Sequence, residues 1–225
     1  MKTIFCSLTL FSCLLYSCTP LAPHQRAAFA HVNEQSYQVI NRNVSSFKEG
    51  NYEGIQLSAK DDEGIAWLVG ENFSTGTIEF DVQGREEFQR SFVGVAFHGQ
   101  DNETYEAVYF RPFNFQSDEA IRRSHGVQYI AHPDYTWRVL RTLRTMEYEN
   151  QVQPTNIQAT EWFHARLEVD ENTVRVFVND NPQPSLEVER IRKDLTDGRI
   201  GFWVGFGSDG RFANLEIHDS SSPTR

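Results

Sequence analysis

The sequence predicts an all-β fold, a two-sheet antiparallel jelly-roll sandwich with one short helix over a loop region. Three observations predict it: short segments alternate between apolar and polar residues, turns rich in Asp, Asn and Gly separate these segments, and no rhythm of strand, helix and strand appears. With 225 residues, of which 39% are hydrophobic, the chain is long enough to bury one core of ordinary size.

The individual strands follow from alternation with a period of two. The segments that fit this period are Tyr37–Asn41, Gly54–Ala59, Gly64–Val69, Thr77–Gln83, Ser91–His98, Thr104–Arg111, Gly126–Ile130, Trp162–Asp170, Thr173–Asn179, Ser185–Glu189, Arg199–Gly205 and Arg211–Ile217. Together they predict a β-sandwich domain over residues 36–219, followed by a short tail over residues 220–225.

The stretch over residues 91–115 is the most informative, because it reads as two strands joined by the turn Gly-Gln-Asp-Asn. One face of this pair is aliphatic and aromatic, so we expect it to face the core. The other face has a floor of glycine and alanine, from which three polar side chains rise: His98, Tyr109 and Arg111. Small floor residues let a ligand approach the backbone, and the polar residues offer donors and stacking surface. The alternative is that a loop covers this face and the small residues make room for it.

A different pattern over residues 135–150 predicts the helix. Trp137, Leu140, Leu143 and Met146 recur at steps of three, which is typical of a short helix lying across the sheet. Between residues 111 and 144 the chain has six arginines against three acidic residues. Because arginine pairs with carboxylate or sulfate through two hydrogen bonds, this surplus indicates a rim that attracts an anionic ligand. The alternative is a solvated helix face.

The N-terminus has the pattern of a targeting signal. Lys2 precedes an apolar run, Ile4–Tyr16, that is too short to span a bilayer stably. The run ends in Leu-Tyr-Ser-Cys at residues 15–18, which resembles the lipobox of bacterial lipoproteins. That resemblance implies cleavage before Cys18, acylation of Cys18 and a lipid-anchored place in the bacterial cell envelope, on its periplasmic side or at the cell surface. Residues 18–35 would then be a tether. The alternative is an ordinary secretory signal cut near Ser17 or later.

Cysteine and charge exclude several classes of function. All three cysteines lie within the first 18 residues, so the domain has neither a disulfide framework nor a thiolate nucleophile or zinc–thiolate site. Without residues 1–17, whose only charge is Lys2, the net charge of −10 becomes −11, which argues against nucleic acid as a partner. Acidic turns can bind calcium, but no spacing here matches an EF-hand. No cofactor is therefore expected, and calcium has no motif to support it.

The C-terminal half carries motifs of a known superfamily. They are EWFH at residues 161–164, a hairpin strand over residues 174–179 that ends in Asn, GRIGF at 198–202 and FANLEI at 212–217. With these motifs the chain resembles the concanavalin A-like lectin/glucanase superfamily and, within it, the 3-keto-disaccharide hydrolase domain. The resemblance implies two curved antiparallel sheets and a concave face that often binds sugar.

In that frame, alternation assigns further residues to the concave face. His164 and Arg166 point away from the apolar positions of their strand, Gln128 alternates with apolar neighbours, and Trp203 follows an inward Phe202. The predicted ligand-binding set is His98, Tyr109, Arg111, Gln128, His164, Arg166 and Trp203. Planar donors for hydroxyl groups beside an aromatic plate for a ring's CH face suit a sugar. The alternatives are a core tryptophan and a buried histidine whose hydrogen bonds are satisfied.

Catalytic motifs are missing or incomplete. Glucanases of the superfamily resemble one another in a strand motif Glu-x-Asp-x-Glu, but this chain has EFDVQ at residues 79–83, and EVDEN at 168–172 does not fit either. No Gly-x-Ser-x-Gly, His-Glu-x-x-His or phosphate loop appears. We therefore expect an envelope-anchored protein that binds an oligosaccharide or polysaccharide without turning it over. The alternative is a hydrolase or lyase on the same face, using His98, Tyr109, Arg111 or His164. A third option is an interaction domain without a small ligand.

Overall fold

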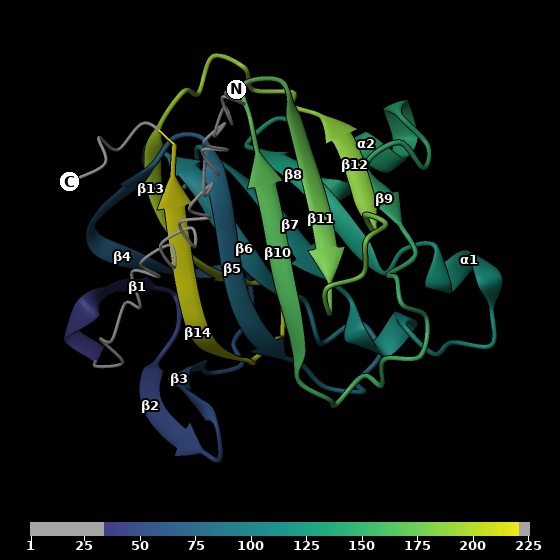
Figure 1. Cartoon of the computed structure of the whole chain (residues 1–225), viewed down its shortest axis with the longest axis horizontal. Coiled ribbons are helices and arrows are strands. Elements are labelled where there is room, and N and C mark those ends of the chain that lie inside the picture. Colours follow the sequence, from purple (N-terminus) through teal and green to yellow (C-terminus); the bar gives the residue numbers. More distant parts are fainter. Residues whose placement is uncertain (1–33, 221–225) are drawn as a thin grey trace, which may run out of the picture.

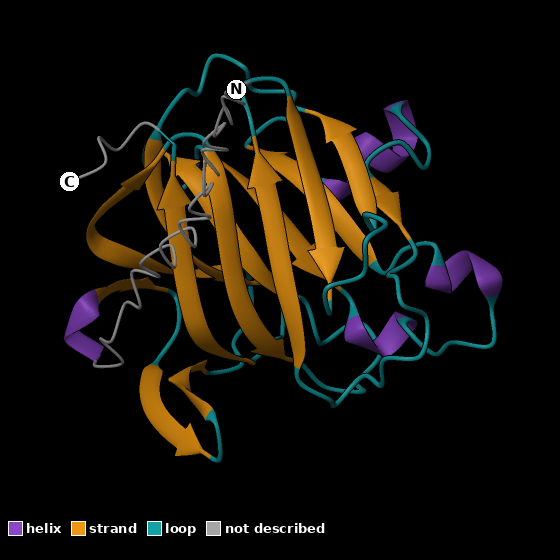
Figure 2. Cartoon of the chain, in the orientation of Figure 1, coloured by secondary structure: helices purple, strands orange, loops and turns teal. Residues whose placement is uncertain are grey.

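The computed structural model describes residues 34–220 as two antiparallel sheets that face each other across one core (Figures 1 and 2). The first, which we call the β7 sheet, has the order β1-β4-β13-β6-β7-β8-β9. Its strands are β1 (Tyr37–Ile40), β4 (Gly64–Phe73), β13 (Gly198–Val204), β6 (Val93–Gly99), β7 (Tyr105–Phe110), β8 (Val127–His132) and β9 (Glu149–Asn150). The second, the β10 sheet, has the order β12-β11-β10-β5-β14-β3-β2. Its strands are β12 (Leu186–Glu189), β11 (Thr173–Val178), β10 (Phe163–Val169), β5 (Gly76–Gln83), β14 (Gly210–Asp219), β3 (Tyr52–Leu57) and β2 (Val44–Glu49). The predicted two-sheet sandwich is confirmed.

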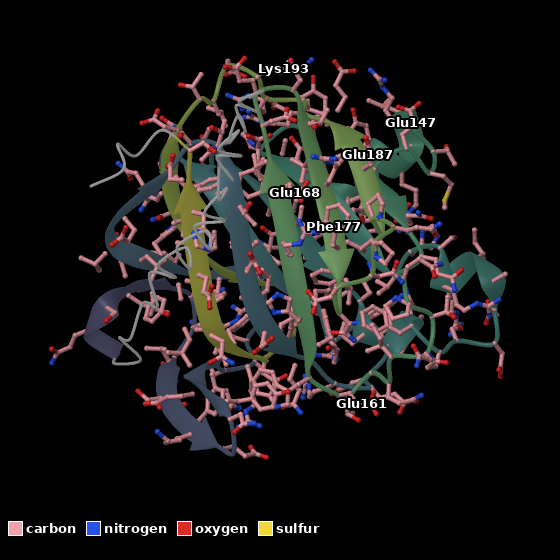
Figure 3. All side chains as sticks on the ribbon, viewed as in Figure 1. Glu147, Glu161, Glu168, Phe177, Glu187 and Lys193 are labelled. Atoms are coloured by element: carbon pink, nitrogen blue, oxygen red, sulfur yellow. The ribbon has the colours of Figure 1, made fainter. Side chains whose placement is uncertain are left out.

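The β10 sheet shows directly how alternation produces a half-buried sheet. In β10 every second residue is buried, beginning with Phe163, while the residues between them are half-buried. The exposed side of this sheet is polar, and Figure 3 shows Glu168 and Glu187 standing on it. The inner side supplies half of the core.

The β7 sheet differs because it is covered on both faces. Every residue of β6 and β7 is buried. Its inner face packs against the β10 sheet: the rings of Phe110 and Phe163 lie 5.0 Å apart between centroids, and those of Phe202 and Phe212 lie 4.4 Å apart. Loops and helix α2 (Trp137–Leu143) partly cover its outer face. Because both faces are covered, the side chains on the outer face of β7 are held in place by their neighbours.

The helix predicted over residues 135–150 is confirmed as α2, but it buries less than its pattern indicated. Thr136 caps its N-terminus by accepting a hydrogen bond from the Val139 backbone N–H. Of the residues at three-residue steps, only Leu140 is buried, whereas Trp137 is 40% and Leu143 67% exposed. The apolar side chains at the two helix ends are therefore exposed to solvent, and Trp137 lines the cavity described below.

Several elements lie outside the predicted set. Strand β2 forms a hairpin with β3 that extends from the body of the sandwich (Figure 1), and β9 is only two residues long. Short helical turns occur at η1 (Glu34–Ser36), η2 (Pro112–Asn114) and α1 (Ala120–Arg123). Each is too short to produce a clear period in the sequence.

The predicted signal segment, Cys18 and all but the last two residues of the predicted tether lie outside the described residues, as do residues 221–225, most of the predicted tail. Within residues 34–220, no helix has the length and apolar character needed to cross a membrane.

Candidate functional site

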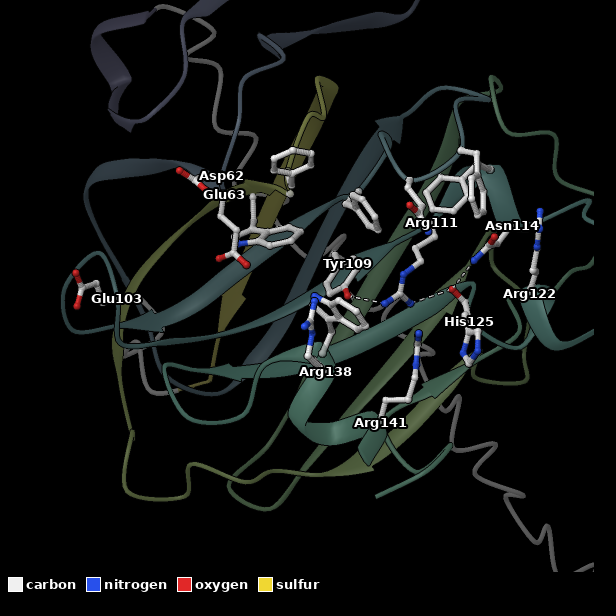
Figure 4. A pocket seen from close by; sticks show the side chains of 18 residues that line it. Asp62, Glu63, Glu103, Tyr109, Arg111, Asn114, Arg122, His125, Arg138 and Arg141 are labelled. Carbon is white, nitrogen blue, oxygen red and sulfur yellow. Dashed lines mark hydrogen bonds between the residues drawn. The ribbon is translucent and has the colours of Figure 1, made fainter. Parts of the chain in front are cut away.

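A cavity of about 1020 Å³ lies on the outer face of the β7 sheet. Side chains of β7 and β13 form its floor, and its walls come from segments far apart in the sequence: residues 62–63, 88–92, 113–125 around η2 and α1, helix α2, and residues 205–206 (Figure 4). The volume is at the upper end of the roughly 300–1,000 Å³ typical of small-molecule sites. The cavity therefore has room for a ligand larger than one sugar ring.

The floor consists of two aromatic rings. Tyr109 and Trp203 lie 4.8 Å apart between ring centroids and are tilted by 34°. Their strands are not neighbours, because β6 runs between them and places Gly94 directly opposite both residues. The indole nitrogen of Trp203 donates to the Tyr105 hydroxyl at 3.2 Å, and this bond fixes the orientation of the ring. Burial raises the pKa of Tyr109 to about 12, so its hydroxyl stays protonated at neutral pH.

Arg111 lies beneath one end of the cavity and is held by four neighbouring residues. Its Nη2 donates to the Tyr109 hydroxyl at 2.7 Å and to Gln128 Oε1, and its Nη1 donates to the His125 carbonyl at 3.0 Å. The Glu149 carboxylate lies 3.5 Å from Nη1. The side chain is only about 6% exposed. Arg111 therefore links the floor of the cavity to its wall. Most of its N–H donors are already engaged by protein groups and are not available to a ligand.

Glu149 lies just behind the cavity wall and contacts both Arg141 and His125. Its carboxylate accepts two hydrogen bonds from Arg141, at 2.8 and 2.6 Å, and its Oε2 lies 2.9 Å from His125 Nδ1. Burial alone would raise the pKa of Glu149, but the bonds from Arg141 and the charge of Arg111 outweigh burial and lower it. Glu149 is thus a buried carboxylate that stays charged beside a histidine of the cavity wall.

His125 belongs to the loop between α1 and β8. Its side chain is about 16% exposed and lines the cavity. Burial lowers its pKa, the charge of Glu149 raises it, and the charges of Arg141 and Arg111 lower it further, with a net lowering. The imidazole is consequently neutral at pH 7.

Three exposed aromatic side chains surround the mouth of the cavity. Phe88, Trp137 and Phe206 are 54%, 40% and 49% exposed, and all three line the cavity. Each has an arginine over its ring, with Arg122 4.6 Å from the centroid of Phe88 and Arg138 5.2 Å from that of Trp137. Large apolar side chains usually avoid water, so their gathering at one opening indicates a binding surface.

Charge is separated along the cavity. Arg122, Arg138 and Arg141 line the end near α1 and α2, whereas acidic side chains line the opposite end: Asp62, Glu63 and Glu103. Arg141 is engaged by Glu149, and Arg122 by Glu119 at 3.0 Å. Arg138 forms no ion pair with any residue that the structure describes. It is therefore the cation of this wall that is most open to a ligand.

A model of the 3-keto-alpha-glucoside-1,2-lyase-like domain matches residues 31–218. The chain belongs to this family. The match spans nearly the whole described part of the chain, and it confirms the family to which the C-terminal motifs pointed. No curated protein sequence matches the chain.

Solved structures share the fold of this lyase-like domain. A carbohydrate-binding module from Bacillus subtilis, CBM66, aligns with a TM-score of 0.58 and 13% identity, covering 80% of this chain and 93% of that one. A Bacillus subtilis protein of unknown function with a galectin-like fold aligns with a TM-score of 0.54 and 13% identity, covering 82% and 90%. A candidate glycosyl hydrolase from Parabacteroides distasonis aligns with a TM-score of 0.50 and 13% identity, covering 84% and 92%. At such identities the likeness concerns the fold alone.

Three of the predicted site residues of the lyase-like domain meet at this cavity. Tyr109, Arg111 and Trp203 line it together, as strand alternation indicated. Gln128 lies on the same face but is fully buried, and its Oε1 accepts hydrogen bonds from Tyr109 and Arg111. It supports the floor from below and does not line the cavity.

The predicted orientation of His98 is wrong. Its φ of 52° is left-handed, so the strand alternation breaks there and the side chain turns to the inner side. His98 is fully buried, with Nδ1 2.6 Å from a Glu106 carboxylate oxygen and 3.0 Å from Arg190 Nη2. It belongs to a buried ionic network of the core.

The predicted positions of His164 and Arg166 are also wrong. Both are on β10 and face outward from the opposite sheet. His164 contacts Asp81 at 2.9 Å through Nδ1 and Glu79 at 3.2 Å through Nε2, and Arg166 lies over Phe177. Alternation correctly indicated that they leave the core, but it does not tell which of two sheets a strand joins. No group of three or more metal-ligating side chains is placed to hold a metal ion within residues 34–220.

Several lining residues have no direct signal in the sequence. His125, Phe88 and Phe206 lie in loops, where no period reports the direction of a side chain. Trp137 was included in the helix pattern as a packing residue, although it is half-exposed at the mouth. The arginine surplus over residues 111–144 was the available signal, and it does mark the basic wall.

Proposed function

We propose that the cavity on the β7 sheet binds a carbohydrate. The observation that carries this proposal is the combination of a Tyr109–Trp203 floor with three exposed aromatic side chains at the mouth. Sugar rings present apolar CH faces that pack on aromatic rings, and hydroxyl edges that need donors and acceptors. The carboxylates of the acidic end and the guanidinium groups of the basic end would supply both kinds of partner. The shared fold with CBM66, a carbohydrate-binding module, supports the proposal.

We further propose that the ligand carries a negative charge at the basic end. Arg138 has no ion-pair partner among the described residues, and its side chain is exposed at the basic end of the cavity. A carboxylate or sulfate on the sugar would pair with such guanidinium groups, and the pairing would weaken with added salt. A uronic acid or a sulfated sugar fits this chemistry.

A glycan panel of matched neutral and uronic-acid oligosaccharides, titrated calorimetrically, tests both parts. Trp137→Ala and Phe206→Ala should each reduce affinity roughly tenfold, equivalent to about 1.4 kcal/mol, because they remove exposed ring surface without disturbing the core. Leu143→Ala is the matched control, since Leu143 is an exposed apolar residue of the same helix outside the cavity. Equal affinity in all three variants, or no binding by the unchanged protein, would contradict the proposal.

The cell envelope is the proposed location. The lipobox-like end of the N-terminal segment supports acylation of Cys18 and attachment through a tether over residues 18–35. Metabolic labelling with a clickable fatty acid tests this directly. Label in the unchanged chain and none in Cys18→Ser is the expected result, and equal label in both would contradict it.

A second candidate function is elimination on a 3-keto glucoside. The family match favours it, because the family is described by a 3-keto-alpha-glucoside 1,2-lyase activity. The basic wall would then stabilise the negative charge that develops on the keto oxygen during the reaction, instead of a charge on the sugar itself. Release of the aglycone from a 3-keto glucoside, with none from the parent glucoside, would distinguish this reaction from simple binding and from hydrolysis.

A further inference from the structure

We propose that His125 is the general base of this cavity and that Glu149 positions it. The inference deepens the second candidate function and rests on the proposed sugar site. The substrate class is a glycoside with a carbonyl at carbon 3. His125 would remove the proton from carbon 2.

Geometry selects His125 among the titratable groups near the floor. It is the histidine that lines the cavity, and its Nδ1 lies 2.9 Å from the buried Glu149 carboxylate. The Nδ1–H bond and the carboxylate oxygen are close but not aligned, so Nδ1 has no hydrogen-bond partner in this conformation. A small rotation of the ring would form the hydrogen bond. Nδ1 would then carry the proton, which leaves the Nε2 lone pair free to accept one. Nε2 forms no hydrogen bond with the described residues.

The carboxylates of Asp62, Glu63 and Glu103 line the opposite end of the cavity, away from the basic wall. The remaining candidate bases fail on position or protonation. Tyr109 keeps its proton because burial raises its pKa to about 12. His98 is sealed in the core, and His164 stands on the opposite sheet. Glu149 is about 2% exposed and does not line the cavity, so it can act only through His125.

The reaction balances without an added oxidant or reductant. The carbonyl at carbon 3 acidifies the proton on carbon 2, and His125 Nε2 accepts that proton. The electron pair forms the double bond between carbons 1 and 2, and the bond from carbon 1 to the aglycone oxygen breaks. The aglycone leaves as an alcohol after taking a proton from the imidazolium or from water. During proton removal, negative charge collects on the oxygen at carbon 3, where the free guanidinium of Arg138 would stabilise it.

The charges around His125 give the rate a definite pH dependence. Glu149 faces it from β9, Arg141 from α2 and Arg111 from the end of β7. The base must be neutral, so the rate should rise with pH through the pKa of His125. Removing the Glu149 charge lowers that pKa further and should move the rising limb to lower pH, while a purely structural role of Glu149 would leave the limb in place.

The experiment uses the purified chain and p-nitrophenyl 3-keto-α-glucoside, with p-nitrophenyl α-glucoside as the unactivated counterpart. The unchanged protein should release nitrophenol from the keto sugar alone. His125→Ala should lower that rate roughly 10²–10⁴-fold, the range for loss of a general base, and added imidazole should restore part of it. The substitution keeps the His125 carbonyl that binds Arg111 and Asn114, so the fold should persist. His164→Ala, another histidine beside a carboxylate but on the opposite face, is the matched control and should keep the full rate.

The outcomes separate this inference from the sugar site itself. Binding of p-nitrophenyl α-glucoside, without release from the keto sugar, would overturn the base and leave the site standing. A full rate in His125→Ala would do the same. If the protein neither bound p-nitrophenyl α-glucoside nor released nitrophenol from the keto sugar, both the base assignment and the sugar site would be overturned. Glu149→Gln supplies the pH profile, and if that variant does not fold, imidazole rescue of His125→Ala still decides the assignment.

Discussion

Tyr109 and Trp203 face each other across a glycine. Both residues pair with Gly94 on β6, from its two sides, and their rings approach to 4.8 Å between centroids above it. A Cβ at position 94 would collide with the base of the Tyr109 side chain, 2.8 Å from its Cβ. The aromatic floor of the cavity therefore depends on one residue that contributes no atom to it.

Gly94→Ala tests this dependence. A Cβ at position 94 would lie 2.1 Å from the Val108 carbonyl oxygen and 2.6 Å from the Tyr109 Cα, which are backbone atoms with little freedom to move. We expect the free energy of unfolding to fall by about 1–3 kcal/mol or more, the range for overpacked cores, and sugar affinity to fall with it. Urea denaturation followed by intrinsic fluorescence measures the first effect. Unchanged stability would show that the two strands can separate freely here.

The buried network of Glu106, Arg190 and His98 should control stability. Glu106 and His98 are fully buried, and Arg190 Nη2 donates to the Glu106 carboxylate at 2.6 Å. Arg190→Met removes the counter-charge and should cost about 3–5 kcal/mol, whereas adding Glu106→Gln should recover part of that loss. A double-mutant cycle in urea measures the coupling. Independent, additive effects would contradict the network.

Acid should weaken the same network. Burial alone would raise the pKa of Glu106, but the hydrogen bonds from His98 and Arg190 outweigh burial and lower it. A carboxyl with a lowered pKa stabilises the folded state above its unfolded value, about 4.3, and that contribution disappears as pH falls through the folded pKa. Unfolding measured from pH 7 to pH 3 should therefore lose less stability in Glu106→Gln than in the unchanged protein. Parallel pH curves would be inconsistent with this assignment.

His164 should titrate above the ordinary histidine value. The hydrogen bond to Asp81 raises the pKa of His164, and the nearby Glu79 raises it further. Burial lowers this pKa but offsets only part of the rise. The charged imidazole therefore stabilises the folded state below about pH 6.5, and this contribution is lost as pH rises through the folded pKa. An NMR titration of the imidazole protons should show a raised pKa that falls in Asp81→Asn. An ordinary pKa in both proteins would contradict the contact.

Arg138 should distinguish charged from neutral sugars. Arg138→Gln should weaken binding of a uronic-acid oligosaccharide more than binding of its neutral counterpart, and the difference should shrink at high salt. Arg175→Gln on the opposite sheet is the matched control, because Arg175 is also an exposed arginine that faces away from the core. Equal losses for the two sugars would remove the anionic part of the proposal.

Strand alternation predicted much of the fold and part of the site. Because β7 keeps a regular period of two, alternation located its core face correctly. It thereby also placed Tyr109 and Arg111 on the opposite, outer face. It failed at His98, where one left-handed residue reverses the direction of the side chain. It also could not assign β10 to a sheet, since strands of both layers present an outward face. His164 was therefore placed on the wrong surface.

The wall of the cavity is made by loops and tertiary contacts, which leave no periodic trace. His125 meets Glu149 only because β8 pairs with the two-residue strand β9, a strand too short to detect in the sequence. Helix α2 was detectable, but its orientation, which exposes Trp137 at the mouth, depends on how it packs against β8. These features required the folded structure.

The indole N–H signals of the four tryptophans test the central claim most directly. Trp137 and Trp203 line the cavity, while Trp162 stacks on Tyr52 at the β2–β3 hairpin and Trp67 is buried. In ¹H–¹⁵N spectra recorded during titration with the best ligand of the glycan panel, the signals of Trp137 and Trp203 should shift together and saturate, while that of Trp162 stays fixed. Saturable shifts confined to Trp162, or no shift at Trp137 and Trp203, would contradict a sugar site on the outer face of the β7 sheet.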